Sequence, residues 1–216
     1  MANTIWLSHT GIEALERCPR CFWLQYVKGI YQPEGIVSRL ANRFDKVLKN
    51  YFNIYRNTGE LPPMIQGKIE GKLQNPYQET YWIRIDNRYG FKGKLDECIV
   101  EKNGEHIPLD FKTASTDPRD RETLAAYQSQ IDAYLFLLAQ NNKKVGDFGY
   151  LMYVYPDQGT ELHDKFPMVI HIKKLRGNPA NTAKKIASAI RILEGKMPAP
   201  APSCPFCNYR NIRIEE

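Results

Sequence analysis

The sequence predicts an α/β fold with a helical N-terminal portion, and two kinds of periodicity predict it. Apolar side chains recur every three to four residues from Ser8 to Gly29 and again in residues 36–56, IVSRLANRFDKVLKNYFNIYR, as in amphipathic helices. Short runs of β-branched and aromatic residues between Asp-Asn and Asn-Gly turn signals fill the middle of the chain, as expected for strands. The expected order of elements is α, α, β, β, β, α, β, β, α.

Each element has its own local signal. The first helix has Ser8 or Thr10 as its cap, and Pro19 interrupts it. After the second helix, we expect three consecutive antiparallel strands, a helix, two strands and a helix, at residues 79–85, 89–102, 106–114, 123–141, 148–156, 166–174 and 181–196. The final segment, MPAPAPSCPFCNYR, is expected to be a proline-rich linker.

The composition is that of a folded protein with a basic surface. The 216 residues, 43% of them hydrophobic and 25% charged, are enough to bury a core and exclude extensive disorder. The formal net charge of +6 favours a polyanionic partner. No run of 18 apolar residues and no signal-peptide pattern is present, so we expect a cytoplasmic protein that does not enter a membrane.

The segment PLDFKTAS carries the strongest chemical signal. Because side chains alternate along a strand, Asp110 and Lys112 share one face, while Phe111 points to the other and can anchor the strand in the core. Asp96 lies fourteen residues before Asp110, and a hairpin through EKNGEH folds it back beside Asp110. Two neighbouring carboxylates repel each other unless a cation lies between them.

A divalent metal ion is the simplest such cation. Mg²⁺ binds one or two protein carboxylates and keeps coordination positions for phosphate oxygens, which suits phosphodiester hydrolysis. Lys112 would then orient the attacking water. An isolated Asp-x-Lys is more often a solvated surface pair, so the interpretation depends on its context.

Three motifs supply that context. GKLDE (93–97), LDFKT (109–113) and QIDAY (130–134) occur in the order and at separations that resemble the RecB-like branch of the PD-(D/E)xK nuclease superfamily. The resemblance covers most of the chain. It implies a restriction-endonuclease-like core, in which helices flank a mixed central β-sheet.

The resemblance also implies roles for individual residues. Asp96, Asp110 and the carbonyl of Phe111 would bind the catalytic Mg²⁺ or Mn²⁺, and Lys112 would assist the nucleophile. Gln130 and Tyr134 would support the site or contact DNA. Their spacing of four residues puts both on one face of a helix, although Tyr134 alone would be read as a core residue.

One position departs from this family. RecB-like nucleases usually carry a metal-binding histidine in the early helix, preceded four residues before by glycine, and Asp45 and Ala41 occupy the matching positions here. Carboxylate oxygen still suits Mg²⁺ or Mn²⁺. We therefore expect Asp45 to be a further ligand, the alternative being a solvated carboxylate on the helix surface.

Two Cys-x-x-Cys pairs lie at opposite ends of the sequence. Together the thiolates of Cys18, Cys21, Cys204 and Cys207 provide the four ligands of a Zn²⁺ ion or an iron-sulfur cluster. Similarity to RecB-like exonucleases, including those of CRISPR adaptation, favours the cluster, with zinc as the alternative. Those proteins usually take one cysteine from CPR and three from the C-terminal end, whereas Arg213 stands at the expected last position here.

The remaining expectations concern organisation and substrate. We expect a single nuclease domain, 1–216, with a helical N-terminal portion at 1–60, a core at 77–196 and a cysteine-bearing segment at 197–216. Lys92 and Lys94 share the strand parity of Asp96 and are candidate DNA contacts, while Cys98 is expected to be a small buried hydrophobe.

The predicted function is therefore metal-dependent hydrolysis of DNA phosphodiester bonds by an exonuclease or by a nuclease directed to single strands or ends, and the sequence leaves exonuclease and endonuclease action both open. The alternative is a catalytically silent DNA-binding or scaffold protein with a structural zinc or iron-sulfur site. The sequence does not identify any protein partners.

Overall fold

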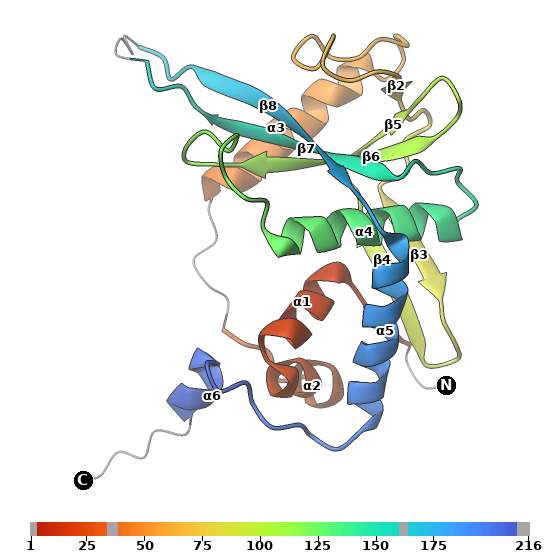
Figure 1. The fold of residues 1–216 in the computed structure, drawn as a ribbon, viewed down its shortest axis with the longest axis vertical. Helices are drawn as coiled ribbons and strands as arrows, with labels where there is room; N and C mark the ends of the chain where they lie inside the picture. Colours follow the sequence, from red (N-terminus) through yellow and green to blue (C-terminus); the bar gives the residue numbers. More distant parts are fainter. Residues whose placement is uncertain (1–3, 34–38, 160–163, 211–216) are drawn as a thin grey trace. The chain divides into compact units, whose positions relative to one another are not determined.

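The computed structural model describes residues 4–33, 39–159 and 164–210, and Figure 1 shows the course of the chain. The chain divides into two compact units. Unit 1 comprises Met1–Val37, Trp82–Lys92 and Ala180–Glu216, and unit 2 comprises Ser38–Tyr81 and Gly93–Pro179. The portions expected from the sequence are consecutive along the chain, whereas each unit is assembled from segments that are distant in sequence.

Unit 2 is built on a mixed five-stranded sheet with the strand order β2-β5-β6-β7-β8. Its strands are β2 (Lys72–Leu73), β5 (Glu97–Val100), β6 (His106–Thr113), β7 (Phe148–Pro156) and β8 (Met168–Arg176). The strands β6 and β7 are parallel, and the other neighbouring pairs are antiparallel. A parallel pair needs a crossover connection, and helix α4 (Ala125–Gln140) lies between these two strands in the sequence.

Two helices cover this sheet, one on each face (Figure 1). Helix α3 (Arg39–Tyr55) contributes Phe52, whose ring centroid lies 5.0 Å from that of Phe111 on β6. Asp110, the residue before Phe111 on β6, contacts Gln130 of α4. Since successive side chains of a strand point to opposite faces, these contacts place α3 and α4 on opposite sides of β6.

Unit 1 contains the helices α1 (His9–Arg17), α2 (Pro19–Lys28), α5 (Pro179–Glu194, which begins at the boundary) and α6 (Pro205–Arg210). Strand β1 (Ile5–Leu7) pairs in parallel with β4 (Tyr89–Lys94), which also neighbours β3 (Thr80–Arg84). Within the described ranges, no helix combines the length and apolar character needed to cross a bilayer.

The single helix expected at residues 8–29 is two helices. Ser8 caps the first as predicted, since its Oγ accepts a hydrogen bond from the Gly11 N–H at 3.2 Å. Cys18 has an extended backbone, with φ −161° and ψ 111°, and Pro19 begins the second helix. Proline is favoured at the first helical position because it has no N–H to donate, and the break puts Cys21 in the first turn of α2.

Two further expectations need correction. The run 89–102 is not one strand: β4 ends at Lys94, β5 begins at Glu97, and the two belong to different sheets. The predicted C-terminal linker contains the short helix α6. Strands β1 and β2 were also missed, because elements of three and two residues are too short to show a hydrophobic period.

Candidate active site and cysteine cluster

Asp110 lies at the centre of a polar network between β6 and α4. Its side chain is 1% exposed. Its Oδ1 accepts hydrogen bonds from Gln130 Nε2 at 2.9 Å and from the Tyr134 hydroxyl at 3.2 Å. The structure therefore brings both side chains of the QIDAY motif onto Asp110, because residues four apart on α4 share the face that covers the strand.

Lys112 completes this network on the same face of β6. Its ammonium forms an ion pair with Asp110 Oδ2 and donates a hydrogen bond to Gln130 Oε1 at 2.8 Å. It also lies 4.4 Å from the ring centroid of Tyr127, which precedes Gln130 by one turn of α4. The amine is thus held in one orientation by an anion, an amide and an aromatic face.

Asp96 reaches the same place from the neighbouring strand. In the antiparallel pairing Glu97 lies opposite Leu109, so the residue before β5 comes level with Asp110. Asp96 Oδ2 accepts a hydrogen bond from the Phe111 N–H at 3.0 Å. The hairpin predicted from the sequence does bring the two aspartates onto adjacent positions of the sheet.

Asp45 meets Asp96 through a residue that the sequence interpretation missed. The Lys49 ammonium lies 3.1 Å from Asp45 Oδ1 and 3.0 Å from Asp96 Oδ1. The spacing of four residues between Asp45 and Lys49 is typical of an ion pair on a helix. The sequence around them gave no indication that Asp96 would be the second partner of Lys49.

At this site, burial and the neighbouring charges act in opposite directions on Asp110 and Lys49. Burial raises the pKa of Asp110 to about 6, although the ammonium of Lys112 acts in the opposite direction. Burial disfavours the charged form of Lys49, but Asp96 and Asp45 outweigh it and raise the pKa of this amine. Each acidic group is therefore stabilised by a lysine in this structure.

The donor set fits a hard divalent cation in its chemistry, since it consists of carboxylate oxygens. The three carboxylates do not form a closed cage. Within the described residues, the four cysteines are the only group of three or more His, Cys, Asp or Glu residues whose ligand atoms all lie within 4.8 Å of one another. The ammonium groups of Lys49 and Lys112 occupy positions beside the oxygens that would bind the ion.

A buried ion pair next to Asp96 was also missed. Glu97 points to the opposite face from Asp96, is 1% exposed, and receives the guanidinium of Arg56 at 2.6 and 3.1 Å. Tyr77 supports the same corner, since its hydroxyl lies 2.9 Å from the carbonyl oxygen of Asp96. Together they fix the backbone where β5 begins.

The two lysines expected to contact DNA have other partners. Lys94 Nζ lies 3.3 Å from Glu79 Oε2 in unit 2, and its side chain is 70% exposed. Lys92 belongs to unit 1, where its ammonium lies 5.9 Å from the ring centroid of Trp6. Their role towards DNA stays a prediction.

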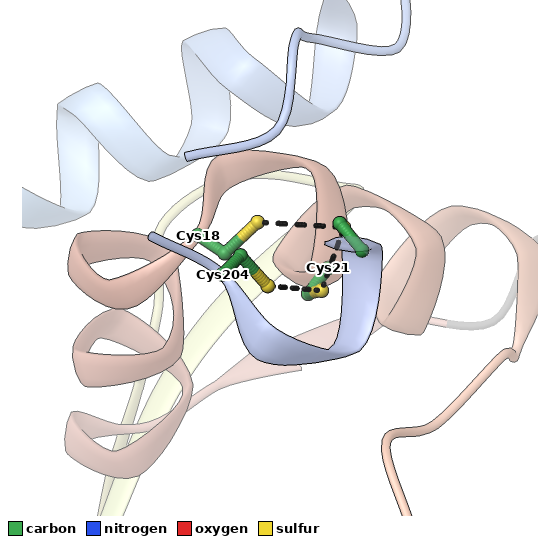
Figure 2. Close-up of side chains that lie close together, drawn as sticks. Cys18, Cys21 and Cys204 are labelled. Carbon is green, nitrogen blue, oxygen red and sulfur yellow. Dashed lines mark hydrogen bonds between the residues drawn. The ribbon is translucent and has the colours of Figure 1, made fainter. Parts of the chain in front are cut away.

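The four cysteines of the two Cys-x-x-Cys pairs gather in unit 1 (Figure 2). All four are buried, with Sγ–Sγ distances of 3.6 Å from Cys21 to Cys204, 3.6 Å from Cys21 to Cys207 and 3.9 Å from Cys18 to Cys207. Burial and the neighbouring sulfurs raise the pKa of Cys207 to about 12, so four thiolates need a cation to coexist there.

Two other cysteine expectations have different outcomes. Cys98 is fully buried on β5 and lies outside the cluster, as expected of a small hydrophobic side chain. Arg213, which stands where the family resemblance implies a last cysteine, lies outside the described residues.

Comparison with known proteins identifies the superfamily of this chain. The model of the PD-(D/E)XK nuclease superfamily matches residues 60–212. The chain belongs to this superfamily, and the resemblance expected from the three motifs is confirmed.

Individual relatives are distant. The CRISPR-associated exonuclease Cas4 of Saccharolobus solfataricus is 25% identical over 173 residues, which are 77% of this chain and 70% of that protein. The crystal structure of SSO0001 aligns with a TM-score of 0.48 and 19% identity, covering 91% of this chain and 80% of the other. The alkaline exonuclease LHK-Exo from Laribacter hongkongensis aligns with a TM-score of 0.42 and 9% identity, covering 87% and 85%.

Proposed function

We propose that this protein hydrolyses phosphodiester bonds of DNA, with the reaction at Asp96, Asp110 and Lys112. The observation that carries the proposal is the network in which Gln130 and Tyr134 hold Asp110 while Gln130 also orients Lys112. A buried acid with a raised pKa and a fixed amine beside it is an arrangement typical of catalytic sites. Membership in a nuclease superfamily gives this arrangement its reaction class.

Asp96 and Asp110 would hold the catalytic Mg²⁺ or Mn²⁺, with Asp45 and the carbonyl of Phe111 as further ligands. When bound, such an ion polarises the phosphate and lowers the pKa of a water molecule. Lys112 orients that water towards the phosphate, since Gln130 and Tyr127 leave its ammonium little freedom to move away. Gln130 and Tyr134 keep Asp110 in position through their hydrogen bonds to its Oδ1.

The substrate proposed is DNA that is single-stranded or has free ends. The net charge of +6 suits a polyanion, and the names of the relatives describe exonucleases. Lys92 and Lys94 are proposed to contact its backbone.

The test uses the full chain with end-labelled linear single- and double-stranded DNA, in Mn²⁺, in Mg²⁺ and in EDTA. The wild type should degrade DNA only with a divalent ion, and Asp110→Asn and Lys112→Met should lose at least about a hundredfold in rate. Lys102→Met, which removes an exposed lysine from the β5–β6 turn, is the charge-matched control and should stay active. Equal rates in all four proteins would overturn the assignment, and DNA binding that survives EDTA, together with no hydrolysis in Mn²⁺ or Mg²⁺, would support the silent scaffold.

For the cysteine cluster we propose a single zinc ion. Four sulfurs arranged tetrahedrally at the usual Zn–S distance of about 2.3 Å lie about 3.8 Å from one another. The three Sγ–Sγ distances of 3.6 to 3.9 Å support that arrangement. In a four-iron cluster each thiolate binds a different iron, which spreads the sulfurs further apart. This geometry favours zinc over the cluster that the family resemblance suggests.

Metal analysis of anaerobically purified protein tests this assignment. We expect about one zinc per chain and no visible charge-transfer absorption. Stoichiometric iron with acid-labile sulfide and a brown colour would show that the site holds an iron-sulfur cluster and not zinc. The proposal for the acidic site would not be affected.

A further inference from the structure

The Lys49 ammonium lies between two carboxylates that belong to different parts of the chain. Asp45 is on the same helix, α3, whereas Asp96 directly precedes β5. The ammonium is nearly equidistant from the two Oδ1 atoms, at 3.1 and 3.0 Å. An ordinary surface pair joins two residues, but here one cation is shared by two acids.

The partial burial of this group strengthens the interaction. The Lys49 side chain is 31% exposed and that of Asp96 is 20% exposed. Two carboxylates brought together in such a place need a positive charge between them, and the only one in contact with both oxygens among the described residues is Lys49.

Lys49 and Lys112 hold their acids in different ways. Lys112 is fixed by Gln130 and by the ring of Tyr127 in addition to Asp110. The polar contacts of the Lys49 ammonium found in the described chain are those with Asp45 and Asp96. Its four-carbon stem is flexible, so Lys49 is the amine that can leave without disturbing other contacts.

We propose that Lys49 is an internal counter-cation that takes the place of the catalytic metal ion between Asp45 and Asp96 and is displaced when a divalent ion binds. The inference rests on the proposed function of the acidic site. A divalent ion and an ammonium cannot both lie between the same two oxygens, because the two cations repel each other at that distance. Lys49 therefore keeps the carboxylates together in the metal-free protein and competes with the ion for them.

This competition predicts the direction in which the affinity for the metal ion changes when Lys49 is replaced. Removing the ammonium destabilises the metal-free state, where it neutralises two acids, and relieves repulsion in the metal-bound state. Both effects tighten metal binding. A residue that merely supports the fold would have the opposite effect, since its loss would loosen the ligands and weaken binding.

The experiment is calorimetric titration of the full chain with Mn²⁺ in the absence of DNA. Lys49→Met should lower the Kd by about tenfold, the change that corresponds to 1.4 kcal/mol. Lys49→Arg, which keeps the cation, should bind no more tightly than the wild type. Lys46→Met is the matched control, because Lys46 is exposed on the same helix and its loss changes the net charge equally.

The outcomes separate this inference from the function on which it rests. A Kd for Lys49→Met equal to or weaker than that of the wild type, with an intact unfolding transition, overturns the inference. Lys49→Gln repeats the test if the methionine variant does not fold. Equal tightening in Lys46→Met would reduce the effect to net charge and also overturn it. If no variant binds Mn²⁺, or if Asp96→Asn binds it as tightly as the wild type, the proposed metal site itself is wrong.

Discussion

The buried ion pair of Arg56 and Glu97 gives the sharpest prediction about stability. The side chains are 8% and 1% exposed, and the guanidinium makes contacts of 2.6 and 3.1 Å with the two carboxylate oxygens. Arg56→Met removes both contacts and leaves the buried carboxylate without a counter-charge, with the Cys98 N–H as its remaining donor at 2.9 Å. Breaking a buried pair from one side costs about 3–5 kcal/mol.

This loss is large compared with the total stability of a domain, about 5–15 kcal/mol. For a chain of this length it should lower the thermal midpoint by about 10 °C. The assay is urea and thermal unfolding of the wild type, Arg56→Met, Glu97→Leu and the double variant. The double variant should be more stable than the two separate losses predict, because it leaves no unpaired charge.

The pH dependence gives an independent check. Burial raises the pKa of Glu97 and Arg56 opposes this effect, so removal of Arg56 raises the pKa further. The folded state then keeps a proton that the unfolded state has lost above about pH 4, and stability falls as the pH rises through the folded pKa. Arg56→Met should therefore be closer to the wild type at low pH. A cost below about 1 kcal/mol, or simple additivity in the double variant, would refute the reasoning.

Three further predictions concern the two sites. In metal-free protein the pKa of Asp110 is about 6 instead of 3.8, so the folded state retains a proton that the unfolded state loses. The free energy of unfolding should thus fall by about 3 kcal/mol as the pH rises from about 3 to about 7. Urea titrations across this range should show that Asp110→Asn flattens the fall, and an equally steep fall would contradict it. Tyr127→Leu should lower kcat about tenfold with little change in the Kd for DNA, because it removes the aromatic face beside the Lys112 ammonium. Tyr127→Phe keeps this face and should keep the rate. Equal losses of kcat in the two variants would exclude a role for the ring. Removing the cysteine-bound metal with a chelator should lower the thermal midpoint, and Cys98→Ala should retain the full zinc content, which metal analysis would show.

The sequence was most informative where function depends on local geometry. Alternation along one strand was enough to put Asp110 and Lys112 on one face and Phe111 on the other, and the structure has this arrangement. The four-residue spacing of Gln130 and Tyr134 likewise fixed their common helix face. A turn signal at a suitable distance then sufficed to bring Asp96 level with Asp110.

The same local reasoning failed where one strand ends and another begins without a change in residue type. The run 89–102 keeps the residue types of a strand throughout, but its two halves pair in different sheets. Pairing partners, which a hydrophobic period does not specify, decide where such a strand ends.

Only the tertiary structure decided which charges meet. The sequence presents Asp45, Lys49 and Asp96 as one helical pair and a distant acid, and it gives no reason to join Arg56 to Glu97. It also leaves open whether the two Cys-x-x-Cys pairs surround one ion. The physical reason is that periodicity reports the direction of a side chain within its own element, whereas the partner of a buried charge or thiolate comes from whichever distant segment packing places beside it.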